Sequence, residues 1–312
     1  MRIRQLRPVL ATLASTVAAA VLLTACGSSD STTPADSTAP AGAAPYASLA
    51  ASPACAQLRG QHPDLAGKKM TNAINPHTPG YESISVSDPN RYEGFDIDLG
   101  EAIGACLGFT VSYLPVSFET LLPTLRSGQA NFVISDIYAT RERAASADFI
   151  TYSKVFDGVL VAKGNPKKLT GIDDSLCGTT TALNKGFVEV PLVAAQSAKC
   201  TAEGKPAAQA SLFDNNADCV QAILAGRADS YINDVNTVTR FVKDQPDQLD
   251  RATAVTLPYS IGIGVPKDNT AIRAAFTGAL TEVQRSGLQA TLSKKWQLDE
   301  SAIESPSLVT AS

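Results

Sequence analysis

The chain has 312 residues, of which 44% are hydrophobic and 18% are charged, and its formal net charge is −4 at pH 7. A mildly acidic chain argues against nucleic acid as a partner. Only two histidines are present, His62 and His77, and neither a Cys-x-x-Cys nor a His-x-x-x-His spacing occurs. The sequence therefore predicts no metal site, and it points to no cofactor.

The N-terminus has the features of an export signal. Three arginines lie within the first seven residues, and residues 9–23 form an apolar run that is too short for a membrane span. The run ends in Leu-Thr-Ala-Cys-Gly, around Cys26, which resembles a bacterial lipoprotein signal. This implies that residues 1–25 are a signal peptide and that acyl chains such as palmitate hold Cys26 at the outer face of the cell membrane. The alternative is a plain secretory signal in which Cys26 is incidental.

Residues 26–53 are rich in Ser, Thr, Ala, Pro and Gly, and they are expected to form a flexible tether. Removal of the signal peptide takes away three arginines and no acid, which changes the formal charge from −4 to −7. The folded part is expected to begin near residue 54 and to be long enough for two lobes. No later segment contains 18 consecutive apolar residues.

The first half of the folded part is predicted to alternate strands and helices. In chain order, these are a strand at 68–75, a helix from residue 99, a strand at 109–114, a helix at 118–126 that Ser117 can cap, a short helix at 141 that Thr140 can cap, and a β-rich run at 157–163.

The second half continues the same alternation. Strands are predicted at 179–183, 208–213 and 259–265, and helices at 186–195, 235–242, 269–286 and 288–296. Two final helices with no strand after them suggest that the chain returns to cover the first lobe, with crossovers near 152–155 and 252–256. The expected organisation is lobe 1 at 54–153 and 256–300, lobe 2 at 154–255, and a C-terminal tail at 301–312. Two crossovers permit a hinge bend.

Two stretches of the chain repeat each other, residues 128–136 and residues 226–234. In each, an apolar helical run is stopped by Gly, a β-rich run follows, and an Asp comes eight residues after the Gly. Asp136 and Asp234 are thus expected at strand tips, where open α/β sheets bind ligands. The alternative is that both are ordinary loop caps.

Arg143 follows a predicted strand tip at the start of a short helix, where free backbone N–H groups and a guanidinium favour an anion. We choose it as the anion clamp, with Arg141 second. The alternative is that both arginines are solvated and paired with Glu142.

Three motifs resemble the family 3 extracellular solute-binding proteins, the amino-acid receptors of ABC importers. They are the signature-like residues 94–107, the Thr-x-x-Arg segment 140–143, and residues 225–229 followed by Asp234. The likeness extends from about residue 67 to residue 296. It implies an α/β, two-lobe periplasmic-binding-protein-like (Venus flytrap) fold with two hinge crossovers, of type II.

The resemblance also implies the ligand site. Arg143 would take an α-carboxylate together with backbone N–H groups near Asp136, Tyr138 and Phe187, and Asp234 would accept the α-ammonium. The remaining ligand-binding residues implied are Asn75, His77, Thr78 and the flanking aromatic Phe118. Asp96 and Asp98 are kept out of the site, because roles at the helix start explain them equally well.

The chain departs from the family at two positions, where Asp136 replaces a small or hydroxyl residue and Phe187 replaces Thr. With Asp136 and Asp234 against Arg143, a neutral zwitterion would leave one buried carboxylate over. Three explanations remain open: a cationic ligand, neutralisation of Asp136 by a protein partner, or an ammonium shared by both acids. We lean to a polar or basic amino acid or a related amine.

Six cysteines in an exported protein indicate disulfides. With Cys26 lipidated, we favour Cys177–Cys200 and Cys55–Cys106 with Cys219 unpaired, and Cys177–Cys219 remains an alternative. The protein is expected to be a monomeric, extracytoplasmic, non-enzymatic receptor that partners ABC permease subunits. The alternatives are a dehydratase-like enzyme on the same scaffold and an amino-acid sensor lipoprotein.

Overall fold

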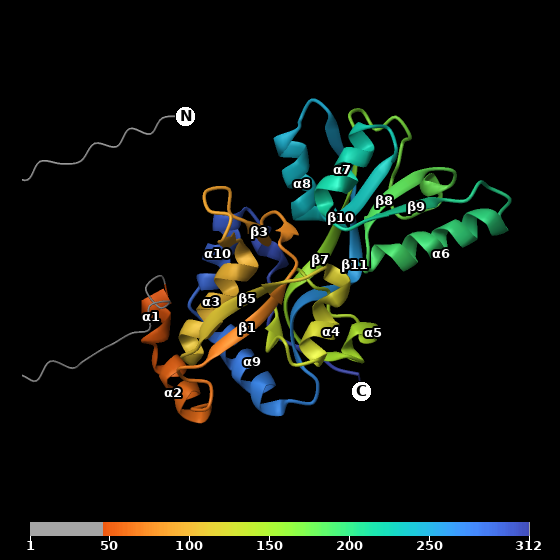
Figure 1. Cartoon of the computed structure of the whole chain (residues 1–312). Coiled ribbons are helices and arrows are strands. Elements are labelled where there is room, and N and C mark those ends of the chain that lie inside the picture. The colour runs from red at the N-terminus through yellow and green to blue at the C-terminus, as the bar shows by residue number, and fades with distance from the viewer. Residues whose placement is uncertain (1–45, 312) are drawn as a thin grey trace, which may run out of the picture. The chain divides into compact units, whose positions relative to one another are not determined.

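Two long strands run through the middle of the main sheet in the computed structural model, which describes residues 46–311. They are β7 (Ala147–Ala162) and β11 (Leu249–Pro266), and they pair antiparallel along most of their length. The main sheet has the strand order β5-β1-β6-β11-β7-β10-β8-β9. Because β7 and β11 stand in the middle of this order, both run from one lobe into the other, as Figure 1 shows.

The first lobe contains the elements that precede β7. They are α1 (Ala47–Ala50), α2 (Pro53–Gln61), β1 (Lys69–Ile74), β2 (His77–Thr78), β3 (Glu82–Ile84), β4 (Tyr92–Glu93), α3 (Phe95–Leu107), β5 (Thr110–Pro115), the 3-10 turn η2 (Phe118–Thr120), α4 (Leu121–Arg126), β6 (Phe132–Val133) and α5 (Arg141–Ala144). Strand β1 pairs parallel with β5 and β6, while β2, β3 and β4 form a small separate sheet.

The second lobe lies between β7 and β11 in the chain. It consists of η3 (Asp174–Leu176), β8 (Thr180–Asn184), α6 (Glu189–Ala202), β9 (Gln209–Phe213), α7 (Asn216–Leu224), β10 (Ser230–Asp234) and α8 (Val235–Asp244). Strand β8 pairs parallel with β9 and β10. After β11, the helices α9 (Thr270–Arg285) and α10 (Leu288–Trp296) pack on α3, so the chain returns to the first lobe as predicted.

The chain passes between the lobes twice, inside β7 and inside β11. The register of the two strands shifts between the Thr256–Phe156 and Ser260–Lys154 pairs. This irregularity lies beside both predicted crossovers, and such a break in the ladder lets strands bend.

The chain differs from the sequence-based expectation at both ends. Helix α1 and the buried Tyr46 and Leu49 lie within the range expected to be tether. The tail also carries secondary structure: after η4 (Glu300–Ala302), β12 (Leu308–Val309) pairs with β7. The expected signal peptide and Cys26 lie outside the described residues.

Two local predictions were wrong. Ser117 makes no side-chain capping bond, because residues 118–120 form a 3-10 turn before α4. Helix α6 begins at Glu189 instead of residue 186, because Gly186 has a φ of +76° and starts a turn.

Both favoured disulfides are confirmed. Cys55–Cys106 joins α2 to α3 across 51 residues, and Cys177–Cys200 joins the end of η3 to α6 across 23 residues. Cys219 is a buried free thiol on α7. Closing loops of these lengths stabilises a fold by about 3–4 kcal/mol each.

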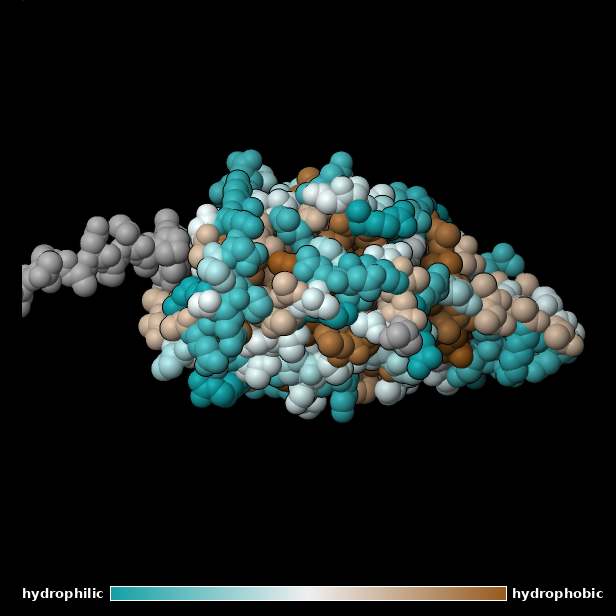
Figure 2. Space-filling model, turned by 90° about the horizontal axis from the view of Figure 1, so that it is seen from below, coloured by the Kyte–Doolittle hydropathy of each residue, from teal (hydrophilic) through white to brown (hydrophobic). Residues whose placement is uncertain are grey.

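The first-lobe core includes the packed rings of Phe109, Phe132 and Phe276. On the face in Figure 2, hydrophobic residues gather in small separate areas among hydrophilic ones. Among residues 46–311, no helix has the length and apolar character needed to cross a membrane.

Candidate functional site

Arg143 lies where the two lobes meet. Thr140 caps the short helix α5 by accepting a hydrogen bond from the Arg143 backbone N–H, as predicted. The guanidinium Nη1 donates to the Tyr138 carbonyl O at 3.0 Å, and Nη2 donates to the Gly186 carbonyl O of the second lobe, also at 3.0 Å. Burial lowers the pKa of Arg143, and the nearby Glu189 opposes this. Arg141, the second choice, is exposed.

Asp234 ends β10 and caps α8. Its Oδ1 accepts hydrogen bonds from the backbone N–H groups of Asn236 at 2.8 Å and Thr237 at 3.4 Å. The side chain is buried, and this desolvation raises its pKa to about 7, with the neighbouring Asp157 acting in the same direction. Asp234 therefore occupies the predicted strand tip, although it also serves as a helix cap.

Asp136 lies three residues beyond β6, in a left-handed conformation with a φ of +42°. It is buried, and Oδ1 has no hydrogen-bond partner within residues 46–311. Burial and then the charge of Asp234 raise the pKa of Asp136 well above its usual range. The repeat thus brings both acids into one electrostatic environment, as the sequence predicted.

Asp96, which the sequence argument set aside, supports this site. Its Oδ2 accepts a 2.6 Å hydrogen bond from the Asp136 backbone N–H, and its Oδ1 accepts from the Tyr152 hydroxyl at 2.8 Å. Burial raises the pKa of Asp96 to about 6. Gly94 permits this arrangement: its φ is +144°, and a Cβ there would lie 2.0 Å from the Tyr81 carbonyl O.

Glu82 is a further buried acid of the first lobe. Its Oε1 accepts from the Ser135 hydroxyl at 2.9 Å. Burial, and then the charges of Asp96 and Asp136, raise the pKa of Glu82 well above normal.

Two more buried acids, Asp157 and Glu189, were missed by the sequence argument. Asp157 of β7 is the register partner of Asp234 on β10 and accepts a 3.1 Å hydrogen bond from the Tyr138 hydroxyl. Glu189 is the first residue of α6 and is fully buried. Burial, and then the neighbouring Glu189, raise the pKa of Asp157 well above normal. A lone acid inside the apolar run 155–162 was the available signal for Asp157.

Aromatic side chains close one side of the site. Phe118 from the first lobe and Phe187 from the second have ring centroids 4.3 Å apart, and the Arg143 guanidinium carbon lies 5.1 Å from the Phe118 centroid. Arg143 thus makes a cation–π contact with the residue expected to flank the ligand. A pocket of about 770 Å³ is lined by both lobes here, including Arg143, Phe187 and Tyr259.

The loop after β1 was expected to contact the ligand, but the polar groups of Asn75 bond to other parts of the protein. Asn75 is buried and its side-chain N–H donates to the Val116 carbonyl O at 3.0 Å. Thr78 is buried and His77 is exposed, both on β2. The Asn75 backbone N–H donates to Ser135 Oγ at 2.8 Å, so this loop is tied to the segment that carries Asp136.

A second set of contacts joins the lobes around Asn236. Its side-chain N–H donates to the Tyr81 hydroxyl at 3.1 Å, and its Oδ1 accepts from the Asp299 backbone N–H at 3.2 Å. Nearby, Arg240 Nη2 donates to the Trp296 carbonyl O at 2.7 Å. Together with the Arg143–Gly186 bond, these contacts show the lobes closed on each other.

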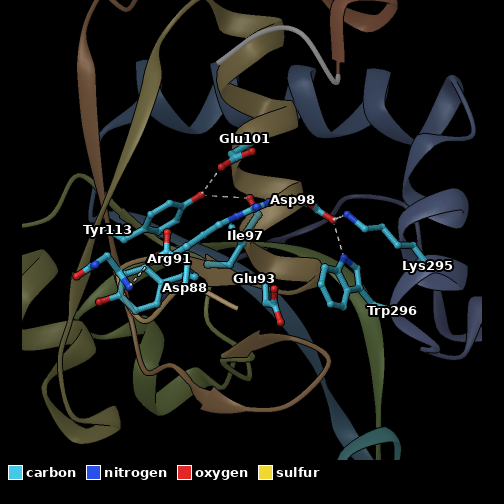
Figure 3. A pocket seen from close by; sticks show the side chains of 11 residues that line it. Asp88, Arg91, Glu93, Ile97, Asp98, Glu101, Tyr113, Lys295 and Trp296 are labelled. Atoms are coloured by element: carbon cyan, nitrogen blue, oxygen red, sulfur yellow. Dashed lines mark hydrogen bonds and ion pairs between the residues drawn. The ribbon is translucent and has the colours of Figure 1, made fainter. Parts of the chain in front are cut away.

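A pocket of about 640 Å³ lies on the first lobe between β4, α3 and α10 (Figure 3). Several of its polar side chains pair with one another: Lys295 and Trp296 point at Asp98, and Tyr113 points at Glu101. This internal pairing contrasts with the unpaired carboxylate oxygens between the lobes. In residues 46–311, no three His, Cys, Asp or Glu side chains are grouped so as to hold a metal ion.

Comparison with known proteins agrees with this architecture. The chain is 26% identical over 236 residues to the ABC transporter arginine-binding protein 1 of Escherichia coli (strain K12), covering 74% of this chain and 91% of that protein. It is 28% identical over 260 residues to the probable histidine-binding protein of Neisseria gonorrhoeae, covering 77% and 91%. The structure of an ancestral arginine-binding protein bound to arginine matches the fold with a TM-score of 0.68 at 24% identity, covering 74% of this chain and 99% of that one.

The family model for bacterial extracellular solute-binding proteins, family 3, matches residues 70–299, which is most of the folded part. The motifs at 94–107, 140–143 and 225–234 fall within this match. By fold and by sequence, the chain belongs to the bacterial extracellular solute-binding proteins, family 3.

Proposed function

We propose that this chain is the substrate-binding component of an ABC transporter, and that it closes its two lobes around a polar or basic amino acid or a related amine. The observation that carries the proposal is the position of Arg143 and Asp234. Arg143 belongs to the first lobe and donates a hydrogen bond to the second lobe. Asp234 ends strand β10 of the second lobe, and its charge acts on Asp136 of the first lobe. Two relatives, which are named as an arginine-binding protein and a probable histidine-binding protein, support this proposal.

Closure follows from the placement of these charges. A ligand that carries an anionic and a cationic group can satisfy Arg143 and Asp234 together only when the lobes are closed. The open form leaves each group in water, so the ligand shifts the equilibrium by its differential affinity for the closed form. A permease that recognises the closed form would thereby recognise the loaded receptor.

We further propose that the mature protein is anchored through lipid on Cys26. The support is the lipobox-like sequence around this residue and membership of an extracellular family. Two or three acyl chains anchor a protein stably where one does not. The test is intact-mass analysis of the membrane fraction. A Cys26→Ala variant recovered from membranes as fully as the parent would refute the anchor.

The ligand is tested by mass spectrometry of small molecules released from the purified, denatured protein. Calorimetric titration with a panel of amino acids and amines then measures their affinities. We expect at least one member to bind tightly and Asp234→Ala to lose that binding while its thermal unfolding remains cooperative. Undiminished binding by this variant would show that the site is elsewhere.

A further inference from the structure

Two buried carboxyl groups stand face to face beside the proposed amine site. They are Asp157, in the strand β7 that both lobes share, and Glu189, at the first position of α6. Both have no exposed surface. They lie where the lobes meet, because Asp157 is bonded to Tyr138 of the first lobe, and Glu189 follows the turn that receives Arg143.

Their oxygens lack donors. When these acids are ionised, no other residue in the range 46–311 donates a hydrogen bond to either oxygen of Glu189, to Oδ2 of Asp157 or to Oδ1 of Asp136. The Asp157 and Glu189 carboxyls can bond to each other only when one of them keeps a proton. Native proteins rarely leave buried acceptors without partners, because each costs the desolvation of a polar group. Together with Glu82 Oε2, these oxygens point to donors that arrive with a ligand.

Arg143 does not supply those donors. Two of its N–H groups are directed at the carbonyl oxygens of Tyr138 and Gly186, and its plane lies by the Phe118 ring. No ion pair joins it to a carboxylate within the described part of the chain. Arg143 thus has Glu189 and Asp136 as buried acidic neighbours, and these belong to a larger group of buried acids that also includes Asp157, Asp234, Asp96 and Glu82.

An ordinary zwitterion does not correct this imbalance, because it adds as much negative as positive charge. Its ammonium can satisfy Asp234, but the acid pair next to it would stay unpaired. A buried charge without a partner is strongly unfavourable. Without such a partner the acid pair keeps a proton, in line with the raised pKa of Asp157, and a second ligand group that is cationic and rich in N–H donors can take the place of that proton.

We infer that Asp157 and Glu189 form a second cation subsite, which holds an ammonium or guanidinium group of the ligand beyond the one assigned to Asp234. The inference rests on the proposed function and names its substrate class: an organic cation with two positive groups. A basic α-amino acid and a diamine without a carboxylate share this chemistry. Asp136, on the opposite lobe, has a free Oδ1 and is close enough to Glu189 and Asp157 for their charges to raise its pKa.

The first experiment compares matched ligands on the mature full-length protein by calorimetry. L-Arginine and L-lysine carry the second cation, L-glutamine is a neutral counterpart, and agmatine has the cations without the carboxylate. We expect the cationic ligands to bind about 100-fold or more tightly than glutamine. If agmatine binds as tightly as arginine, the ligand class is a diamine without a carboxylate. If agmatine binds more weakly, the ligand class is a basic amino acid.

The second experiment uses Glu189→Gln, which keeps the shape and removes the charge. We expect it to weaken arginine or agmatine binding about tenfold or more and to leave glutamine binding unchanged, so that the preference for cations shrinks. The same variant should unfold at a higher temperature without ligand, because the amide of Gln can donate to Asp157 without a shared proton. Glu282→Gln is the matched control: it is a buried acid on α9, paired with Arg285, and it should not change the preference.

Three outcomes are distinguishable. If glutamine binds as tightly as arginine, or if Glu189→Gln preserves the preference for cations, the second subsite is refuted while an amino-acid receptor stands. If no amino acid or amine binds, the proposed function itself fails. If the preference collapses in Glu189→Gln and in Asp157→Asn but not in Glu282→Gln, the subsite is established.

Discussion

Arg143 and Gly186 join the two lobes through one hydrogen bond, in which Nη2 of the arginine donates to the carbonyl O of the glycine at 3.0 Å. The same guanidinium lies against Phe118, whose ring packs on Phe187 of the second lobe. The residue proposed to clamp the ligand anion is therefore also a residue that holds the closed form together.

Arg143→Ala should lower the affinity for the native ligand by about 100-fold or more, because it removes both the anion partner and the bond to Gly186. Arg143→Lys should recover only part of the affinity, since an ammonium lacks the planar fork. Calorimetry measures both. Arg141→Ala, an exposed arginine two residues away, is the control and should bind like the parent. Equal losses at the two arginines would contradict the assignment.

Asn236 connects the proposed amine site to closure. Its backbone N–H holds Asp234, and its side chain bonds to Tyr81 and to the Asp299 backbone in the first lobe. Tyr81→Phe removes one hydroxyl from this connection without changing the ring, so we expect a drop in affinity of about tenfold or less, mainly through faster release. Stopped-flow measurement of the release rate checks this. A slower association with unchanged release would count against a role in closure.

The buried acids make the stability of the unliganded protein depend on pH in an unusual direction. The pKa of Asp234 is raised from 3.8 to about 7, so the folded state holds a proton that the unfolded state has lost between these values. Stability is then fully present below pH 3.8 and falls as pH rises toward 7. Asp96, with a pKa of about 6, adds to the same trend.

We expect the unfolding temperature without ligand to fall by several °C, on the order of 5 °C, from about pH 5 to about pH 8. A saturating cationic ligand should remove much of this decline, because it supplies partners for the ionised acids. Scanning calorimetry across this range measures the effect. Asp234→Asn should flatten the curve, and a stability that rises with pH would contradict the burial of ionisable acids.

The Cys177–Cys200 disulfide should stabilise the second lobe. Replacing both cysteines with serine is expected to lower the free energy of unfolding by about 3 kcal/mol, from the loop of 23 residues that it closes. The midpoint of urea unfolding reports this. Cys219→Ser, at the buried cysteine outside the two bonds, is the comparison. A double replacement no more destabilising than this single one would show that the bond adds little.

The sequence was informative where local chemistry determines local structure. The Gly residues at 128 and 226 follow helices and have positive φ, Asp234 ends β10, and Thr140 caps the helix that carries Arg143. These local features could be predicted without tertiary information, whereas Asp136 lies three residues beyond β6. The two terminal helices also predicted the return to the first lobe, because they were left without a strand of their own.

The rest depends on burial, which spacing does not reveal. Glu189 is the first residue of an amphipathic helix. An acid at this position usually interacts with the positive end of the helix dipole and faces water. Its burial beside Asp157 and Arg143 depends on tertiary packing, which the helix pattern does not show. Asp96 was set aside for the same reason: a first-turn role accounts for it locally, while its bond to the Asp136 backbone depends on a distant loop.

The C-terminal segment runs along the hinge strand. Thr151 donates its backbone N–H to Ser307 O, and β12 pairs with Ile150 and Phe149. Leu308 is half exposed at this place, whereas the native free thiol of Cys219 is buried and its pKa is raised by desolvation. In a variant without Cys26, a cysteine introduced at position 308 would therefore be labelled selectively, and a fluorophore there would report lobe movement from beside the hinge.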